Sequence, residues 1–146
     1  MGVNTYDPGK VIVSVAGVPL SGFAPDSMVE ADREADTWGK VTGITGETAR
    51  VRSRNKSGEF KVSLLQTSTM NDLLSAIHAA DEATGAGIVP IGMTDLGGGT
   101  TLVSAEAWIR KPPPVTMKKE IETREWIFDC AVLDIHVAGN APAGNY

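Results

Sequence analysis

Short apolar segments with a two-residue alternation, separated by glycine and proline, constrain this chain more than any other feature. The 146 residues include 16 glycines and 8 prolines, and only 5% are aromatic. Alternation of apolar and polar side chains is typical of strands with one buried face, and Gly and Pro mark the turns between strands. The sequence therefore predicts a mainly β (α+β) fold of short strands in a single domain, residues 1–146.

The apolar segments divide into six stretches of strand length. They comprise residues 10–20, 45–54, 59–66, 87–94, 100–110 and 120–137, the last forming either one strand or a pair. Polar turns that contain glycine, at residues 55–58 and 95–99, are expected to close two hairpins. Lys111 and the three prolines at residues 112–114 then break the fifth strand, because proline cannot donate a hydrogen bond to a sheet.

An acidic stretch, residues 28–36, alternates unusually cleanly. Its even positions hold acids: Glu30, Asp32, Glu34 and Asp36. Small apolar side chains, including Val29 and Ala31, fall mainly on the opposite face. In a helix the same acids would spread around the cylinder, so we interpret the stretch as a strand with one acidic face, which residues 38–42 continue. A helix is the alternative, because Glu, Ala and Met have high helix propensity.

A helix is expected over residues 69–83. Its apolar side chains repeat at the spacing of one helix face and are expected to face the core: Met70, Leu73, Leu74 and Ile77. Ser68 or Thr69 is positioned to cap the first turn, with Asp72 three residues after Thr69. Gly85 and Gly87 favour a helix end directly afterwards.

Charge and composition limit the functions that the chain can have. A net charge of −5 argues against general attachment to nucleic acid, since basic side chains supply that affinity. Arg50, Arg52 and Arg54 form a basic strand face, which we interpret as solvated or partner-facing, with phosphate binding as the alternative. A polar N-terminal arm, residues 1–9, and a tail of small residues, 138–146, lack the side chains to pack alone.

Residue types that carry chemistry do not occur in catalytic or metal-binding patterns. His78, His136 and Cys130 lack the spacing of metal ligands. The glycines at residues 97–99 lead into a strand, whereas a phosphate-binding loop needs a helix N-terminus. No apolar run approaches the roughly 20 residues that span a bilayer. We therefore expect no enzymatic activity, cofactor, metal or membrane span.

One long segment resembles a known family. Residues 57–74 comprise a strand that ends in the pattern Leu-x-Gln-x-Ser, followed by a helix that carries Asn and Leu. This arrangement is similar to that in the tail tube proteins of contractile-tailed bacteriophages. Further similar stretches occur in the expected order: residues 6–8, Gly17 with residues 21–23, residues 109–113 and residues 119–126.

The resemblance implies a β-sandwich or half-barrel flanked by the helix. It further implies that six copies form a ring and that rings stack into a tube inside a contractile sheath, as a conduit for DNA ejection. The implied partners are other copies of the chain, sheath, baseplate and terminator proteins, and double-stranded DNA in transient, non-specific passage. The implied location is the virion tail, after assembly in the host cytoplasm.

The resemblance also gives the charged faces candidate roles. Glu30, Asp32 and Glu34 are expected to line the lumen, because an acidic wall repels phosphate and lets DNA slide. An outward, solvated face is the alternative. Contacts between subunits or rings are expected at the basic face, which comprises Arg50, Arg52 and Arg54, and at Trp38. The loop of residues 39–46 and the tail of residues 138–146 are further expected contacts.

Two other functional classes remain open. The first is another phage tail structural protein, such as a tail terminator or a baseplate hub component. The second is a small ligand-binding β-sandwich. A tube protein forms long hollow tubes, a terminator forms single rings, and a ligand-binding module forms neither.

Overall fold

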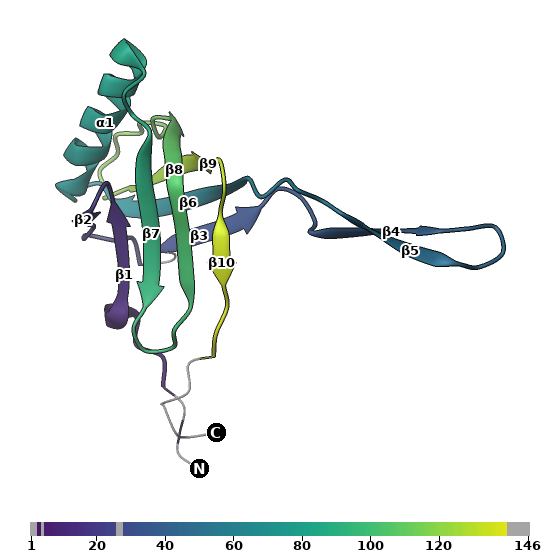
Figure 1. Ribbon diagram of the computed structural model, residues 1–146. Helices are drawn as coiled ribbons and strands as arrows, with labels where there is room; N and C mark the ends of the chain where they lie inside the picture. Colours follow the sequence, from purple (N-terminus) through teal and green to yellow (C-terminus); the bar gives the residue numbers. More distant parts are fainter. Residues whose placement is uncertain (1–2, 4, 26–27, 140–146) are drawn as a thin grey trace.

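The computed structural model describes residues 3, 5–25 and 28–139 (Figure 1). Within these residues the chain forms ten strands, one α-helix and one short 3-10 helix, so the expected mainly β fold with one flanking helix is confirmed. The elements in chain order are η1 (Pro8–Lys10), β1 (Val11–Val15), β2 (Val18–Pro19), β3 (Val29–Arg33), β4 (Trp38–Thr42), β5 (Thr48–Arg52), β6 (Gly58–Leu65), α1 (Met70–Thr84), β7 (Val89–Asp95), β8 (Thr101–Lys111), β9 (Thr123–Cys130) and β10 (Asp134–His136).

Eight of the strands form one antiparallel sheet, and its long strand β8 divides that sheet into two walls. The order is β2-β1-β7-β8-β9-β6-β3, with β10 also paired to β8. The first half of β8 pairs with β7 and β10, and the second half, from Ala107, pairs with β9. We call β2, β1, β7 and the first half of β8 the first wall. The second half of β8 with β9, β6 and β3 is the second wall.

A bulge separates the two halves of β8. Ile91 pairs with Ser104, whereas Val89 pairs with Ala107, so β8 has one more residue than β7 across this interval. Bulges bend the strand that carries the extra residue. In Figure 1 the strands of the first wall consequently run across the direction of β3, β6 and β9.

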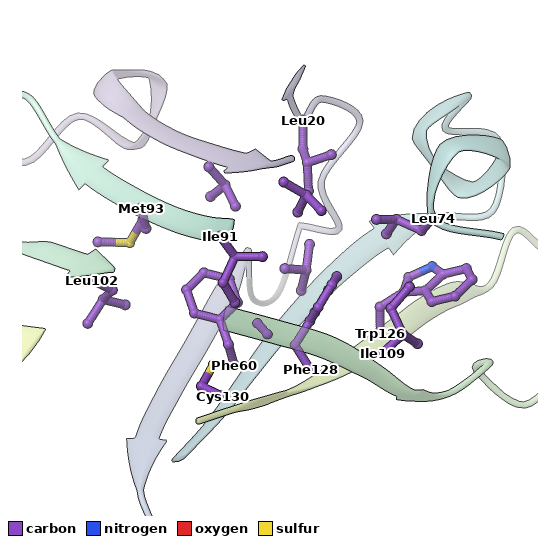
Figure 2. Packing of buried hydrophobic residues seen from close by; sticks show 14 of the residues in the cluster. Leu20, Phe60, Leu74, Ile91, Met93, Leu102, Ile109, Trp126, Phe128 and Cys130 are labelled. Carbon is purple, nitrogen blue, oxygen red and sulfur yellow. The ribbon is translucent and has the colours of Figure 1, made fainter. Parts of the chain in front are cut away.

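The core fills the space between the two walls. Fully buried side chains come from the first wall (Val13, Val15) and from the second wall (Phe60, Phe128), as Figure 2 shows for the surrounding cluster. The rings of Phe60 and Phe128 meet edge to face with their centroids 6.5 Å apart, a favoured aromatic geometry. The inward side of both walls is thus apolar, which leaves their outer sides to meet solvent or partners.

The expectation of one strand over residues 10–20 is wrong. The segment folds back on itself as the hairpin β1–β2, in which Val15 pairs with Val18. Ala16 and Gly17 connect the strands with φ angles of 54° and 81°. Positive φ at both central residues defines the turn type that matches strand twist, and Gly adopts it without strain. A non-glycine residue at the first position concealed this turn in the sequence.

The expectation of a hairpin around residues 55–58 is also wrong. Strand β5 pairs with β4, and β6 pairs with β3 and β9 instead. The Asn55 side chain accepts a hydrogen bond from the Ser57 backbone N–H at 3.0 Å, so this polar stretch bends locally without joining two paired strands. Residues 38–42 accordingly do not continue the acidic strand but open a separate hairpin, which closes at Gly43 to Gly46.

The helix α1 lies where the sequence predicts it, and it packs on the core through its apolar stripe. Leu74 is fully buried, and Met70, Leu73 and Ile77 pack against the core cluster. Gly85 ends the helix in the left-handed conformation, with φ 74°. Of the two predicted capping residues, Thr69 makes no side-chain hydrogen bond to the helix start, whereas Ser68 accepts one from the Met70 backbone N–H.

Two side chains next to the helix start fix it to its surroundings. Ser68 Oγ accepts from the Met70 backbone N–H at 3.3 Å and donates to the carbonyl oxygen of Ser21 at 2.8 Å. Asn71 Oδ1 accepts from Trp126 Nε1 on β9 at 3.0 Å. These bonds join the helix to both the N-terminal loop and the second wall.

The remaining strand predictions are confirmed. Strands β7 and β8 form a hairpin around the glycine-rich turn, and β8 ends at Lys111, directly before the prolines. The last segment is a pair of strands, β9 and β10, and β10 pairs with β8 rather than with β9.

Leu74→Ala is expected to lower the free energy of unfolding by about 2–5 kcal/mol, because it leaves a cavity among fully buried side chains. Ala76→Ser, at an exposed position of the same helix, serves as the control and should cost no more than about 0.5 kcal/mol. Denaturant unfolding followed by circular dichroism measures both. A small effect of Leu74→Ala would contradict the packing of α1 on the core.

Candidate assembly surfaces

The outer side of the second wall is charged. Strand register places Asp32 opposite Glu59 and Glu59 opposite Asp129, so three carboxylates lie side by side on β3, β6 and β9. Glu30 lies opposite Lys61 one step further along. Like charges on directly opposed residues destabilise a sheet unless a counter-charge joins them.

Arg110 on β8 supplies that counter-charge. Its Nε donates to Asp129 at 3.1 Å, and its Nη2 donates to Glu59 at 2.5 Å, so one guanidinium joins three neighbouring strands. These hydrogen bonds, the one to Asp129 first, hold the pKa of Arg110 above its usual value. Carboxyl oxygens of Glu34, Glu59 and Asp129 lie within 4.8 Å of one another. Arg110 therefore stabilises an acidic cluster that would otherwise repel itself.

The acidic strand predicted from alternation is present as β3, and the helical alternative is wrong. Glu30 and Asp32 are exposed, while Val29 and Ala31 pack against the core. Glu34 follows the strand, is also exposed, and accepts a hydrogen bond from Ser57 Oγ at 3.2 Å. All three predicted lumen acids thus lie on or beside the outer side of the second wall.

Sequence reasoning missed the partners of these acids. Glu59 and Lys61 join Glu30 and Asp32 around a shallow depression of about 310 Å³. Alternation along β6 places Glu59 and Lys61 on the face away from buried Phe60, so their position on the outer side of the wall could be predicted. Their proximity to β3 could not, because it depends on which strands pair.

The hairpin β4–β5 forms an arm that extends away from the body (Figure 1). We call residues 37–53 the arm. All ten residues of its two strands are exposed. Pairing places basic and aromatic side chains on one face, namely Trp38, Lys40, Arg50 and Arg52. It places small and apolar residues on the other face, namely Gly39, Val41, Ala49 and Val51.

The arm therefore has one basic face and one apolar face, and neither is covered by the body. The guanidinium carbon of Arg50 lies 3.9 Å from the centroid of the Trp38 ring, a cation–π contact. Ile44, at the turn, is fully exposed. Because an isolated two-stranded hairpin is marginally stable in water, such an arm fits a surface that becomes buried on assembly. Of the predicted contact residues, Trp38, Arg50, Arg52 and residues 39–46 lie in the arm, whereas Arg54 and the tail from residue 138 lie outside it.

The base of the arm is fixed to the body. Leu133, between β9 and β10, is fully buried and donates its backbone N–H to the carbonyl oxygen of Lys56 at 2.8 Å. Its own carbonyl oxygen accepts from Arg33 Nε at 2.8 Å. A side chain on Gly58 would lie 2.5 Å from the Asp32 carbonyl oxygen, so this close approach requires glycine.

Among the described residues, the second wall ends in an unpaired strand edge at each side. Strand β3 is the last in the sheet order. Hydrogen bonds from Ser63 N–H to Met28 and from Glu34 N–H to Ser57 show that even-numbered residues of β3 bond to β6. The backbone groups of Val29, Ala31 and Arg33 therefore point outward.

The opposite edge is the second half of β8. Among the described residues, β7 pairs with β8 only as far as Ala107, and β9 occupies the other side. Residues 108–111 thus have one unpaired side. An unpaired edge is a template for pairing with another chain.

The predicted terminal arms are described only in part. Near the N-terminus, Asp7 Oδ1 accepts from the Gly9 backbone N–H at 2.9 Å and caps η1. Near the C-terminus, Ala138 exchanges two hydrogen bonds with the Thr100 side chain. Residues 1–2, 4 and 140–146, which belong to the expected arms, lie outside the described residues.

The residues considered for chemistry occupy structural positions. His78 Nε2 lies 3.5 Å from Glu82 Oε2 one helical turn away, and the His78 side chain is half-buried. Cys130 is buried, and burial raises the pKa of its thiol. None of the helices in the described part of the chain is long and apolar enough to cross a membrane.

Solved structures of contractile injection systems have the same fold. The chain is similar to the tube-terminating cap of the anti-feeding prophage, with a TM-score of 0.58 and 12% identity over 94% of this chain and 95% of that one. It is also similar to a chain from the PVC sheath/tube terminator in the extended state, with a TM-score of 0.57 and 12% identity over 91% and 97% of the two chains. A chain from the PVC sheath–tube complex has a TM-score of 0.57 and 14% identity over 90% and 91%.

The fold is therefore shared with chains of a tube-terminating cap, a sheath/tube terminator and a sheath–tube complex. Sequence comparison is more specific. Residues 9–138 match the family described as bacteriophage PhiTE tail tube protein, and the chain belongs to this family. It is also 31% identical to structural protein ORF10 of Pseudomonas phage KPP10, over 94% of this chain and 84% of that protein.

Removal of the arm should leave the body folded, because its strands bury nothing in the core. A chain in which a short Gly-Ser linker replaces residues 38–52 is expected to unfold with a free energy within about 0.5 kcal/mol of the intact chain. Denaturant unfolding of both chains in dilute, monomeric solution checks this. A collapse of stability would mean that the arm is part of the folding unit.

Proposed function

We propose that this chain is the tube subunit of a contractile phage tail. Six copies close into a ring, rings stack into a hollow tube inside a sheath, and phage DNA passes through the lumen during ejection. The observation that carries the proposal is the second wall, which has a charged outer side and a free strand edge at each end, in a member of a tail tube family. The role is structural, without a cofactor or enzymatic activity.

Ring closure follows from the direction of the strands in the second wall. Its four strands alternate in direction, so β3 and the second half of β8 run oppositely. Rotation about a ring axis preserves the direction of each strand relative to that axis. Strand β3 of one copy therefore meets β8 of the next in antiparallel orientation, and the copies form a continuous barrel whose diameter grows with strand number.

The outer side of the second wall becomes the lumen in this arrangement. Glu30, Asp32 and Glu34 then contribute acids at similar heights from every copy, with Lys61 and Arg110 as the cations beside them. Repeated rings of acid produce a field stronger than any single side chain does, and this field repels DNA phosphates. DNA thus passes without being held by counterion release.

The arm is the contact between stacked rings. Its apolar face, with Val41 and Val51, becomes buried against the adjacent ring, while Arg50 and Arg52 meet acids there. Trp38 holds Arg50 in place through their stacking contact. The chain without its arm is accordingly expected to form single rings and no tubes.

A terminator is the second candidate function. Two of the solved structures with this fold are a terminating cap and a sheath/tube terminator. The tube role is favoured by the family to which the chain belongs and by the uncovered arm. In either role the protein belongs to the virion tail, is assembled in the host cytoplasm, and meets sheath, baseplate and tube proteins.

Ala31→Pro tests ring closure. The Ala31 N–H points away from β6, so proline at this edge position should leave the subunit folded while removing a donor from the ring contact. The wild-type chain is expected to form hollow tubes of uniform width under negative stain, and the variant is expected to remain monomeric. Glu30→Pro, which removes a bond to β6, should instead unfold the subunit. Tubes of Ala31→Pro would contradict closure through β3.

Glu30→Lys with Asp32→Lys tests the lumen. Both side chains are exposed, so the fold should persist, but tubes of this variant are expected to retain double-stranded DNA at low salt and release it as salt rises. Glu34 is left unchanged because it belongs to the cluster around Arg110. Asp72→Lys with Glu82→Lys on α1 is the control of equal charge. Equal DNA retention by both variants in a sedimentation assay would place the acids outside the lumen.

A further inference from the structure

The connection between β8 and β9 displays apolar side chains on a fixed backbone. We call residues 112–122 the strap. Val115, Met117 and Ile121 are 71%, 74% and 64% exposed. Exposed apolar side chains of this size on one short segment indicate a contact surface. Val115 and Met117 lie close together in the sequence, whereas Ile121 lies near the end of the strap that returns to β9.

The strap is held in place by its polar groups. Buried Arg124 donates from Nη2 to the carbonyl oxygen of Thr116 at 3.2 Å. The Gln66 backbone N–H donates to the carbonyl oxygen of Glu122 at 2.9 Å, and Gln66 Oε1 accepts from the Glu122 backbone N–H at 3.1 Å. The strap is thus anchored at Thr116 and Glu122 before it binds, which lowers the conformational entropy that binding must remove.

An apolar groove of about 490 Å³ opens beside the start of β3. Its lining is predominantly apolar and includes Tyr6, Val11, Met28, Val29 and Met93, with Asp95 as a charged member. The Asp95 carboxylate already accepts from the Gly97 backbone N–H at 3.0 Å. The side chains of Val11, Val29 and Met93 belong to or pack against the core, so the groove leads directly onto it.

The strand pairing proposed for the ring brings this groove to the strap of another copy. Antiparallel pairing places the end of β8, at Lys111, beside the start of β3, at Val29. The strap begins one residue after Lys111, and the groove includes Met28, one residue before β3. Val115 and Met117 lie four and six residues beyond Lys111, a reach of up to about 13–20 Å for extended chain.

We propose that the strap of one copy inserts Val115 and Met117 into this groove of the next copy. The inference rests on the ring closure proposed above. Apolar side chains meet an apolar lining, and the unbranched Met117 side chain adapts to an irregular groove. Each contact between copies in the ring then has two parts. Hydrogen bonds between the strand edges set the relative orientation of the two copies, and the inserted Val115 and Met117 side chains exclude water beside them.

A cysteine pair tests the insertion. A chain that carries both Met28→Cys and Met117→Cys is assembled into tubes, oxidised, dissolved in detergent and separated without reductant. We expect a ladder of disulfide-linked oligomers, lost on reduction. Chains with either substitution alone should remain monomeric on the gel. Native Cys130, 2% exposed, stays outside the reaction. Met28→Cys with Val103→Cys, on the solvent side of the first wall, is the matched control and should also give monomers.

The outcomes distinguish a failure of the proposed strap insertion from a failure of the proposed ring assembly. Tubes that form but give no ladder, or that give only a disulfide within one chain, would overturn the insertion and leave the tube function intact. An equal ladder from the control pair would mean random collision and would equally count against it. A wild-type chain that forms neither rings nor tubes would contradict both proposals. Addition of Ala31→Pro to the cysteine pair should abolish the ladder.

Discussion

The bend in β8 is the constraint on which the rest of the structure depends. One extra residue opposite β7 turns a single antiparallel sheet into two walls, and only then do Phe60 and Phe128 face the side chains of β1 and β7 across a closed core. The same bend frees residues 108–111 from β7 and leaves that edge unpaired. A local irregularity thus creates both the hydrophobic core and the edge on which assembly is proposed.

Charge is unevenly distributed between the arm and the body. The arm, residues 37–53, holds three basic residues and one acidic residue, a net +2 in a chain whose total is −5. The arm extends away from the body of its own copy. In the proposed assembly, its basic side chains are therefore attracted to the acidic body of another copy. Such attraction weakens as salt screens it, whereas burial of the apolar arm face does not. In the proposed tube, the two arm faces therefore contribute an electrostatic and an apolar component to the contact between rings, and the two differ in salt dependence.

Local periodicity made part of this structure predictable. The acidic face of β3 and the buried stripe of α1 follow from alternation at two and at 3.6 residues, which a single segment specifies by itself. Pairing could not be predicted in the same way. The turn at Ala16 lacks the residue that usually marks positive φ, and the arginines of β5 suit a strand without indicating β4 as its partner. The Arg110 cluster was missed for the same reason, since its members come from separate strands.

The clamp at the base of the arm has a mechanical consequence. Lys56 and Arg33 flank the arm, and both bond to the backbone of Leu133, whose side chain is fixed in the core. A pull on the arm is therefore carried through β3 and β6 along their length, where many hydrogen bonds resist together in shear. Without this anchor the same pull would open the two strands one bond at a time. In the proposed tube, tension on the arm is thus transmitted into the most strongly paired part of the subunit.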